Sequence, residues 1–292
     1  MSMCRGSQIK TRNLVLGTAL MALATMTSSA QENRSAAAPS SNEQLVDDLV
    51  SAYKILVNEG VLDSFGHVSF RSATNPEHFF MPRAMPPSLV AAADVMEYRV
   101  ADSQPIDPRG RRVNGERYIH GEIYKARPDV QAVIHSHSQA VIPFSMSKIP
   151  LRPVVVQAGF LPPEVPNFEI RHVRAEGERG MQVTNSIRGA ALAKTLGNSP
   201  VALMRGHGNV VVGSSVKQAT VFAAYTDINA RMQAAALQLS RDITVMNEPE
   251  LFGPSEFDIN RPWENFKQKL LDDKAKAAID RGQFGLEQTQ PR

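Results

Sequence analysis

The hydrophobic positions of this chain follow a helical spacing in three stretches. Apolar residues there recur three and four positions apart, which is the period of an amphipathic helix. Asn42 is a candidate N-cap for the first stretch and Gly60 a stop signal after it, while Pro128 ends the second stretch by restricting the residue before it. The three predicted helices are Glu43–Glu59, Gly115–Arg127 and a long one from Ser214 or Ser215 to about Leu239.

Shorter runs of apolar or alternating residues between these helices predict β-strands. The runs are His67–Arg71, Phe79–Met81, Val130–His137, Val201–Arg205 and Asn209–Gly213. The segment 150–174 is rich in proline and valine and is expected to add a strand and a substrate-facing loop. Strands that alternate with helices, without a glycine-rich phosphate loop, indicate a layered α/β domain.

The first thirty residues carry a different pattern. Lys10 and Arg12 precede an uninterrupted apolar run, Leu14–Met26, and the small residues Ser28 and Ala30 follow it. This is the layout of a secretory signal peptide that is cleaved after Ala30. The apolar run is shorter than the roughly 20 residues that a transmembrane helix needs. We therefore expect a periplasmic or secreted protein whose mature chain has no membrane anchor.

Two further segments flank the expected domain. Residues 31–42 are small, polar and aperiodic, so a flexible leader is predicted there. Residues 43–250 are expected to form one domain, because a chain of this length can bury a large core. Residues 251–292 are first broken by prolines and then charged and amphipathic. We expect this C-terminal extension to pack on the surface or on a neighbouring subunit.

Removal of the signal segment changes the charge balance. The segment holds three of the 32 basic residues and no acidic one, so the rest of the chain has 29 basic against 29 acidic residues. A net charge near zero leaves no electrostatic footprint for nucleic acid or an anionic membrane. The single cysteine, Cys4, also lies in this segment. A metal site in the mature chain must therefore use nitrogen and oxygen ligands.

Three histidines occupy positions from which they can share one metal ion. His135 and His137 lie two positions apart on a predicted strand, so their imidazoles project from the same side, roughly 7 Å apart. His207 lies between two glycines on a predicted turn. Three ligands with an open face are typical of a catalytic metal site. We expect one divalent ion per chain, Zn²⁺ or Mn²⁺ before other metals that imidazole accepts.

Glu116 stands at the start of the predicted helix that precedes these two strand histidines. From this place its carboxylate can lie beside the metal as an acid–base group, or it can ligate the metal. The alternative is an ordinary favourable carboxylate in the first turn of a helix. The sequence pattern leaves these interpretations open.

The candidate residues lie in three motifs that resemble the class II aldolase/adducin superfamily, over roughly Glu43 to Leu239. The motifs are GHVSFR (66–71), ERYIHGEIYKARPDVQAVIHSHS (116–138) and LMRGHGNVVVG (203–213). Glu116 precedes His135 by 19 residues, as in the family's aldolases. The resemblance implies that the three histidines bind the metal and that Glu116 is the catalytic acid–base. It also implies a three-layer α/β/α fold with a mostly antiparallel central sheet, and a homotetramer.

Two positions depart from the sugar-phosphate enzymes of this family. Those enzymes have an asparagine where this chain has His67, and small hydroxyl residues where it has Asn114-Gly115. These groups hold the substrate phosphate, so we do not expect a sugar-phosphate substrate. HSHSQAVIPFS (135–145), PLRPVV (150–155) and LMRGHG (203–208) resemble instead the branch of aromatic hydroxy-dicarboxylate decarboxylases.

The resemblance thus favours a metal-dependent carbon–carbon lyase that decarboxylates a hydroxylated aromatic or related carboxylic acid. Two alternatives stay open: an aldolase or epimerase for an unphosphorylated sugar or hydroxy-ketone, and a non-catalytic adducin-like binding module. His67 is a candidate catalytic residue that orients the substrate or passes a proton, or else a strand-end histidine bonded to the backbone. Arginine pairs with carboxylates bidentately. The arginines in or beside the motifs are therefore candidates for substrate binding or for surface salt bridges: Arg71, Arg83, Arg117, Arg152 and Arg205.

Overall fold

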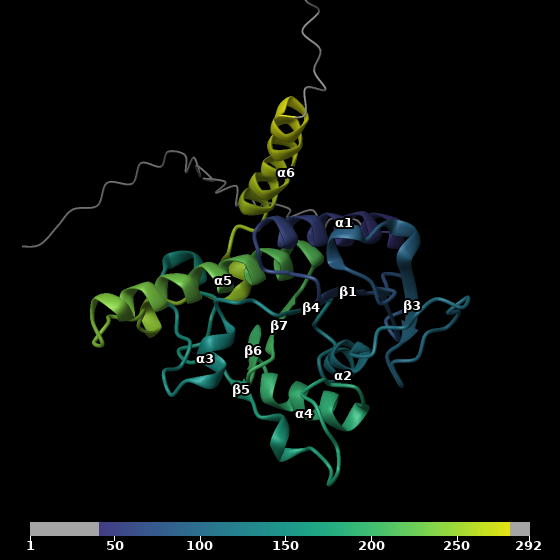
Figure 1. Ribbon diagram of the computed structural model, residues 1–292, viewed down its shortest axis with the longest axis horizontal. Coiled ribbons are helices and arrows are strands. Elements are labelled where there is room, and N and C mark those ends of the chain that lie inside the picture. The colour runs from purple at the N-terminus through teal and green to yellow at the C-terminus, as the bar shows by residue number, and fades with distance from the viewer. Residues whose placement is uncertain (1–40, 281–292) are drawn as a thin grey trace, which may run out of the picture. The chain divides into compact units, whose positions relative to one another are not determined.

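A seven-stranded sheet forms the centre of the computed structural model, which describes residues 41–280 (Figure 1). Its strands are β1 (His67–Arg71), β2 (His78–Pro82), β3 (Val95–Arg99), β4 (Ala132–Ser136), β5 (Asn167–Phe168), β6 (Val201–Met204) and β7 (Gly208–Gly213). They lie in the order β3-β2-β1-β4-β7-β6-β5. Each neighbouring pair is antiparallel except β5 and β6.

The helices cover both faces of this sheet. They are α1 (Asn42–Asn58), α2 (Arg117–Ala126), α3 (Ile142–Met146), α4 (Ser186–Leu196), α5 (Val216–Leu239) and α6 (Asn260–Asp280). The helices α1 and α5 pack together on one face, and α2 and α4 on the other (Figure 1). This arrangement confirms the predicted three-layer α/β/α fold with a mostly antiparallel sheet. None of the helices in the described part of the chain has the length and apolarity to cross a bilayer.

A hydrophobic cluster on each face of the sheet holds the layers together. On β4, Ala132 and Ile134 belong to the cluster beneath α1 and α5, whereas Val133 belongs to the cluster beneath α2 and α4. Successive residues of a strand point to opposite faces. The next residue on the face of Val133 is His135, and this face is the one that α2 covers. The alternation of β4 therefore directs the histidine toward α2.

The first helix begins one residue earlier than the hydrophobic pattern predicts. Ser41, and not Asn42, is the N-cap, because its hydroxyl accepts the backbone N–H of Gln44. Asn42 is the first helical residue and hydrogen-bonds the turn after β1. Residues 31–40 of the predicted leader and the predicted signal peptide, residues 1–30, lie outside the described residues.

The C-terminal helix α6 is anchored to the main body of its own chain. Trp263 and Phe266 are buried in the cluster beneath α1 and α5, with exposed fractions of 1% and 4%. Lys269 adds an ion pair with Glu59, just beyond the end of α1, at 3.1 Å. The start of the helix thus completes this hydrophobic core.

Candidate metal centre

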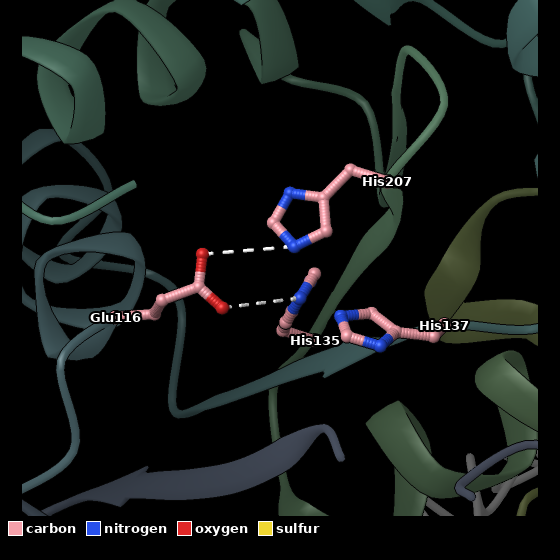
Figure 2. Close-up of side chains that lie close together, drawn as sticks. All are labelled: Glu116, His135, His137 and His207. Carbon is pink, nitrogen blue, oxygen red and sulfur yellow. Dashed lines mark ion pairs between the residues drawn. The ribbon is translucent and has the colours of Figure 1, made fainter. Parts of the chain in front are cut away.

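His135, His137 and His207 converge where β4 ends and β6 turns into β7 (Figure 2). Their ring centroids are 4.8 to 5.0 Å apart in all three pairs. One potential ligand atom from each histidine and one from Glu116 lie within 4.8 Å of one another. The structure therefore brings together the three histidines and the carboxylate that the sequence singles out.

Three imidazole nitrogens in this cluster, Nδ1 of His207 among them, are buried without a hydrogen-bond partner in the described part of the chain. Nδ1 of His135 donates to the carbonyl oxygen of Asn209 at 3.1 Å, so its Nε2 carries no proton and points away from the backbone. Nε2 of His135 and Nε2 of His137 are both buried and unpartnered in the described part of the chain. A backbone carbonyl that accepts a hydrogen bond from one ring nitrogen, and so leaves the other free to bind a metal, is typical of metal-binding histidines. The donor set fits a divalent ion.

The turn between β6 and β7 presents His207 because of the glycines on either side of it. Gly206 has φ +63°, in the left-handed region that glycine adopts without strain. A Cβ on Gly208 would collide with the carbonyl oxygen of Ser136. The N–H of His207 closes the turn by donating to the carbonyl oxygen of Met204 at 2.9 Å. Both glycines are thus required to bring this imidazole to the other two.

Glu116 occupies the N-cap position of α2, but its carboxylate does not cap the helix. Oε2 lies 3.8 Å from Nε2 of His135, and Oε1 lies 3.6 Å from Nε2 of His207 (Figure 2). Oε1 also accepts the backbone N–H of Val183 at 2.8 Å, and the N–H of Glu116 donates to Oδ1 of Asn114 at 2.9 Å. The carboxylate is therefore held against the histidines rather than in the helix's first turn.

The electrostatics of the cluster suit a metal ion. Burial lowers the pKa of His135, His137 and His207, so all three imidazoles are neutral at neutral pH. Neutral imidazole is the form that binds metals. Burial by itself raises the pKa of Glu116, but the histidines around it, led by His67, lower that pKa by more. Glu116 is consequently an ionised carboxylate beside three neutral nitrogen donors.

A cavity of about 990 Å³ opens onto this cluster. Its polar wall includes Glu116, His137, His207 and His67, and Nε2 of His67 lies 3.9 Å from Oε2 of Glu116. The lining also includes apolar side chains and one guanidinium: Phe65, Met85, Met181 and Arg112. The open face of the candidate metal centre is therefore accessible to a small molecule.

Arg71, predicted as a possible substrate-binding residue, lies outside the residues that line the cavity. Its guanidinium is buried and donates to the carbonyl oxygens of Pro76 and Tyr124 at 2.6 Å and of Val130 at 3.1 Å. The same group lies 4.8 Å from the centre of the Tyr124 ring. The hydrogen bonds of Arg71 thus connect β1 to the end of α2.

The other four predicted arginines also lie outside the residues that line the cavity. Each has a partner elsewhere on the described chain, which for Arg83, Arg152 and Arg205 is a salt bridge, as the alternative expected. Contact with substrate stays a prediction for these four arginines. The pairs are Arg83 with Asp94 (2.8 Å), Arg117 with Gln104 (3.3 Å), Arg152 with Glu164 (3.5 Å) and Arg205 with Glu169 (2.6 Å).

Arg112 is the cavity arginine that the sequence analysis missed. It lines the cavity, its side chain is exposed, and it forms no side-chain hydrogen bond or ion pair with the described residues. It precedes Glu116 by only four positions, in the loop that leads into α2. Its closeness in sequence to Glu116 was the one feature that could have marked Arg112 as a cavity residue. The loop itself belongs to none of the three family motifs.

The fold and the cluster of histidines and glutamate define a candidate metal-dependent enzyme of the α/β class. The chain belongs to the class II aldolase/adducin family, because the sequence model of the Class II Aldolase and Adducin N-terminal domain matches residues 47–234. All four residues of the cluster lie within this range.

Several relatives are decarboxylases by name. The chain is 37% identical over 205 residues to the decarboxylase tropJ of Talaromyces stipitatus, which covers 67% of this chain and 77% of the relative. It is 26% identical over 235 residues to the 3,4-dihydroxyphthalate decarboxylase of Arthrobacter keyseri, which covers 73% of this chain and 89% of the relative.

Solved structures agree with the fold. The L-fuculose 1-phosphate aldolase of Glaciozyma antarctica superimposes with a TM-score of 0.61 at 22% identity, covering 80% of this chain and 90% of that protein. At this level of identity the likeness concerns the fold alone.

Proposed function

We propose that this chain is a divalent-metal-dependent carbon–carbon lyase that decarboxylates hydroxylated aromatic carboxylic acids. The observation that carries the proposal is the pair of buried, unpartnered nitrogens on His135 and His137, which face the carboxylate of Glu116 at the end of a cavity. The names of two relatives, one of them a 3,4-dihydroxyphthalate decarboxylase, support the choice of reaction.

The three histidines would hold Zn²⁺ or Mn²⁺, and the bound ion supplies a positive charge that stabilises electron density on a substrate oxygen. Glu116 is ionised, so it can accept the proton of a substrate hydroxyl. Cleavage of the bond to the carboxylate releases CO₂ and leaves its electron pair on the ring carbon. Glu116 then returns the proton to that carbon, which balances the reaction and restores the ionised carboxylate.

The remaining walls of the cavity suit a planar aromatic acid. Phe65, Met85 and Met181 offer aromatic and thioether surfaces, against which an aromatic ring packs favourably. Arg112 is the unpaired cation of the lining, and its guanidinium can bind a carboxylate bidentately. We therefore assign to Arg112 the substrate-binding role that the sequence analysis gave to other arginines.

A combined metal and activity assay tests this function. Purified protein is expected to hold about one divalent ion per chain by elemental analysis, and to release CO₂ from 3,4-dihydroxyphthalate or a related hydroxylated aromatic acid. His207→Ala should lose both properties, whereas His172→Ala, at an exposed histidine outside the cluster, should keep both.

The assay also separates the alternatives. Aldehyde release from unphosphorylated hydroxy-ketones, without CO₂ from aromatic acids, would contradict decarboxylation and favour an aldolase. Metal binding without release of either product would contradict the lyase and favour a binding module. Retention of metal by His207→Ala would show that the site is wrongly assigned.

A further inference from the structure

A row of buried polar side chains runs from the candidate metal centre into the core between α2 and β1. Glu116, His120 and Tyr124 are spaced four apart at the N-cap and along one face of α2. His67 and Ser69 are spaced two apart on β1. Helical and strand periods each bring such residues to one face, so the two sets meet between the helix and the sheet. None of the four residues beyond Glu116 is more than 5% exposed.

Short hydrogen bonds join these four residues into one chain. Nδ1 of His67 lies 2.6 Å from Nε2 of His120, and Nδ1 of His120 lies 2.6 Å from Oγ of Ser69. Oγ of Ser69 in turn lies 2.7 Å from the hydroxyl of Tyr124. Burial lowers the pKa of His120 well below its usual value, so its ring is neutral and has one proton to place.

The hydrogen bonds that link Tyr124, Ser69, His120 and His67 can all be donated in one of two directions. If Ser69 donated to Tyr124, the proton of the buried Tyr124 hydroxyl would have no acceptor among the described residues, since the other group beside that hydroxyl, the backbone N–H of Val133, is itself a donor. A buried donor without an acceptor is strongly disfavoured. Tyr124 therefore donates to Ser69.

The direction at Tyr124 fixes the rest of the chain. Ser69 must then donate its proton to Nδ1 of His120. His120 keeps its own proton on Nε2 and donates it to Nδ1 of His67. Since Nδ1 of His67 is an acceptor, the proton of His67 lies on Nε2.

The other end of the chain favours the same direction. Nε2 of His67 faces Oε2 of Glu116 across 3.9 Å, at the edge of the cavity. A protonated Nε2 is attracted to this carboxylate, whereas a lone pair would be repelled by it. The need of the buried Tyr124 hydroxyl for an acceptor and the negative charge of Glu116 thus lead independently to the same tautomer of His67, with its proton on Nε2.

We infer that Tyr124, Ser69 and His120 act as positioning residues that hold His67 as a neutral imidazole with its proton on Nε2, directed at Glu116. His67 then directs the proton of its Nε2 at the carboxylate, 3.9 Å away, and is not a fourth nitrogen ligand or a general base. The part of this inference that concerns catalysis rests on the proposed lyase function, but the tautomer of His67 does not.

The tautomer is measured directly by ¹⁵N NMR of the zinc-loaded protein with ¹⁵N-labelled histidine. Imidazole ¹⁵N shifts distinguish a nitrogen that carries a proton from one that does not, and His67→Gln identifies the His67 signals among those of the seven histidines. The expected result is a neutral ring protonated on Nε2. A proton on Nδ1, or on both nitrogens, would overturn the inference.

A matched pair of variants tests what holds this tautomer. Ser69→Thr and Ser69→Val place side chains of the same shape in the core, but only threonine keeps the hydroxyl. Val is expected to shift the His67 proton toward Nδ1 and to lower kcat about tenfold at unchanged KM, the size of one hydrogen bond to a charged group. Thr should keep the wild-type spectrum and most of the activity.

Tyr53→Phe serves as the control. It removes a buried hydroxyl that accepts the N–H of Val68 at 2.9 Å and takes no part in the hydrogen-bonded chain from Tyr124 to His67. It should leave the His67 spectrum unchanged. Identical His67 spectra for Ser69→Thr and Ser69→Val would show that Ser69 does not fix the tautomer. Absence of decarboxylase activity in the wild type would contradict the proposed function, and the NMR result would still decide the tautomer.

Discussion

His67 and His135 are directly opposite each other on the neighbouring antiparallel strands β1 and β4, with ring centroids 5.0 Å apart. Directly opposite residues share a face of the sheet. A residue at position 67 therefore lies beside a candidate metal ligand, in contact range of its ring. A substitution at position 67 is therefore expected to act on the candidate metal centre directly, and not only on the wall of the cavity.

Glu116→Gln separates the two interpretations of this carboxylate. If Glu116 transfers the proton, the variant should lose activity by about 100-fold or more and keep its metal, because the three histidines remain. The decisive measurements are kcat and the metal content of the same preparation. Glu164→Gln, at an exposed glutamate, is the control for removal of one surface charge. Parallel loss of metal and activity would instead make Glu116 a ligand.

Arg112 and Arg71 should respond to substitution in opposite ways. Arg112→Leu removes the unpaired cation of the cavity, so KM for an aromatic acid should rise about tenfold to a hundredfold, the range for a hydrogen bond to a charged group. Arg71→Leu leaves buried carbonyl oxygens without donors. It should lower the free energy of unfolding by about 2 kcal/mol or more.

Substrate kinetics and denaturant titration of both variants check this pair of predictions. The Arg71→Leu protein that remains folded should keep the wild-type KM, and Arg112→Leu should keep the wild-type stability. A raised KM for Arg71→Leu with no effect of Arg112→Leu would reverse the two assignments.

Buried tyrosines are expected to limit stability at alkaline pH. Burial raises the pKa of Tyr98 to about 12 and also raises the pKa of Tyr53 and Tyr124. Each group prefers its proton in the folded state, so its contribution is complete below the unfolded pKa of about 10 and is lost as the pH rises above it. These three of the five tyrosines should ionise only as the protein unfolds.

Tyrosinate absorbance and circular dichroism, followed together between neutral and strongly alkaline pH, measure this coupling. The main rise in tyrosinate absorbance should coincide with loss of the folded spectrum. Ionisation of all five tyrosines near their ordinary pKa, with the fold intact, would contradict the burial of these side chains.

Export and assembly are the two predictions that concern the whole protein. Expression with the full N-terminal segment should yield a periplasmic or secreted chain that begins at Gln31, as intact mass reports. Light scattering of that product should give four chains per particle. An uncleaved chain retained in the cytoplasm would exclude the signal peptide, and a monomer would exclude the tetramer.

Local patterns made the histidine cluster of the candidate metal centre predictable from sequence. His135 and His137 are two positions apart on a strand, so their side chains point to the same face of the sheet. The glycines on either side of His207 likewise determine the direction of its side chain through the local backbone alone. The structure adds the long-range part, since Glu116 meets His207 only because α2 packs near the β6–β7 turn. That contact joins residues far apart in sequence, and the family resemblance was what indicated it.

The helix α4 and the cavity arginine were not predictable in the same way. Gly189 lies in the middle of α4 and weakens its helical pattern, yet a Cβ there would collide with the carbonyl oxygen of Tyr118 on α2. The glycine is required by helix packing, which a local pattern does not contain. The direction of a long arginine side chain likewise depends on partners that are distant in sequence. No local pattern therefore distinguishes Arg71, which is buried against backbone carbonyls, from Arg112, which lines the cavity.

The two walls of the cavity come from different kinds of structure. The histidines and Glu116 lie at the ends of strands and of α2, whereas Phe65, Met85 and Met181 lie in irregular segments between elements. Loops tolerate substitution better than the elements they connect. Directed evolution confined to these three apolar positions therefore has a route to new substrate ranges that leaves the reaction chemistry in place.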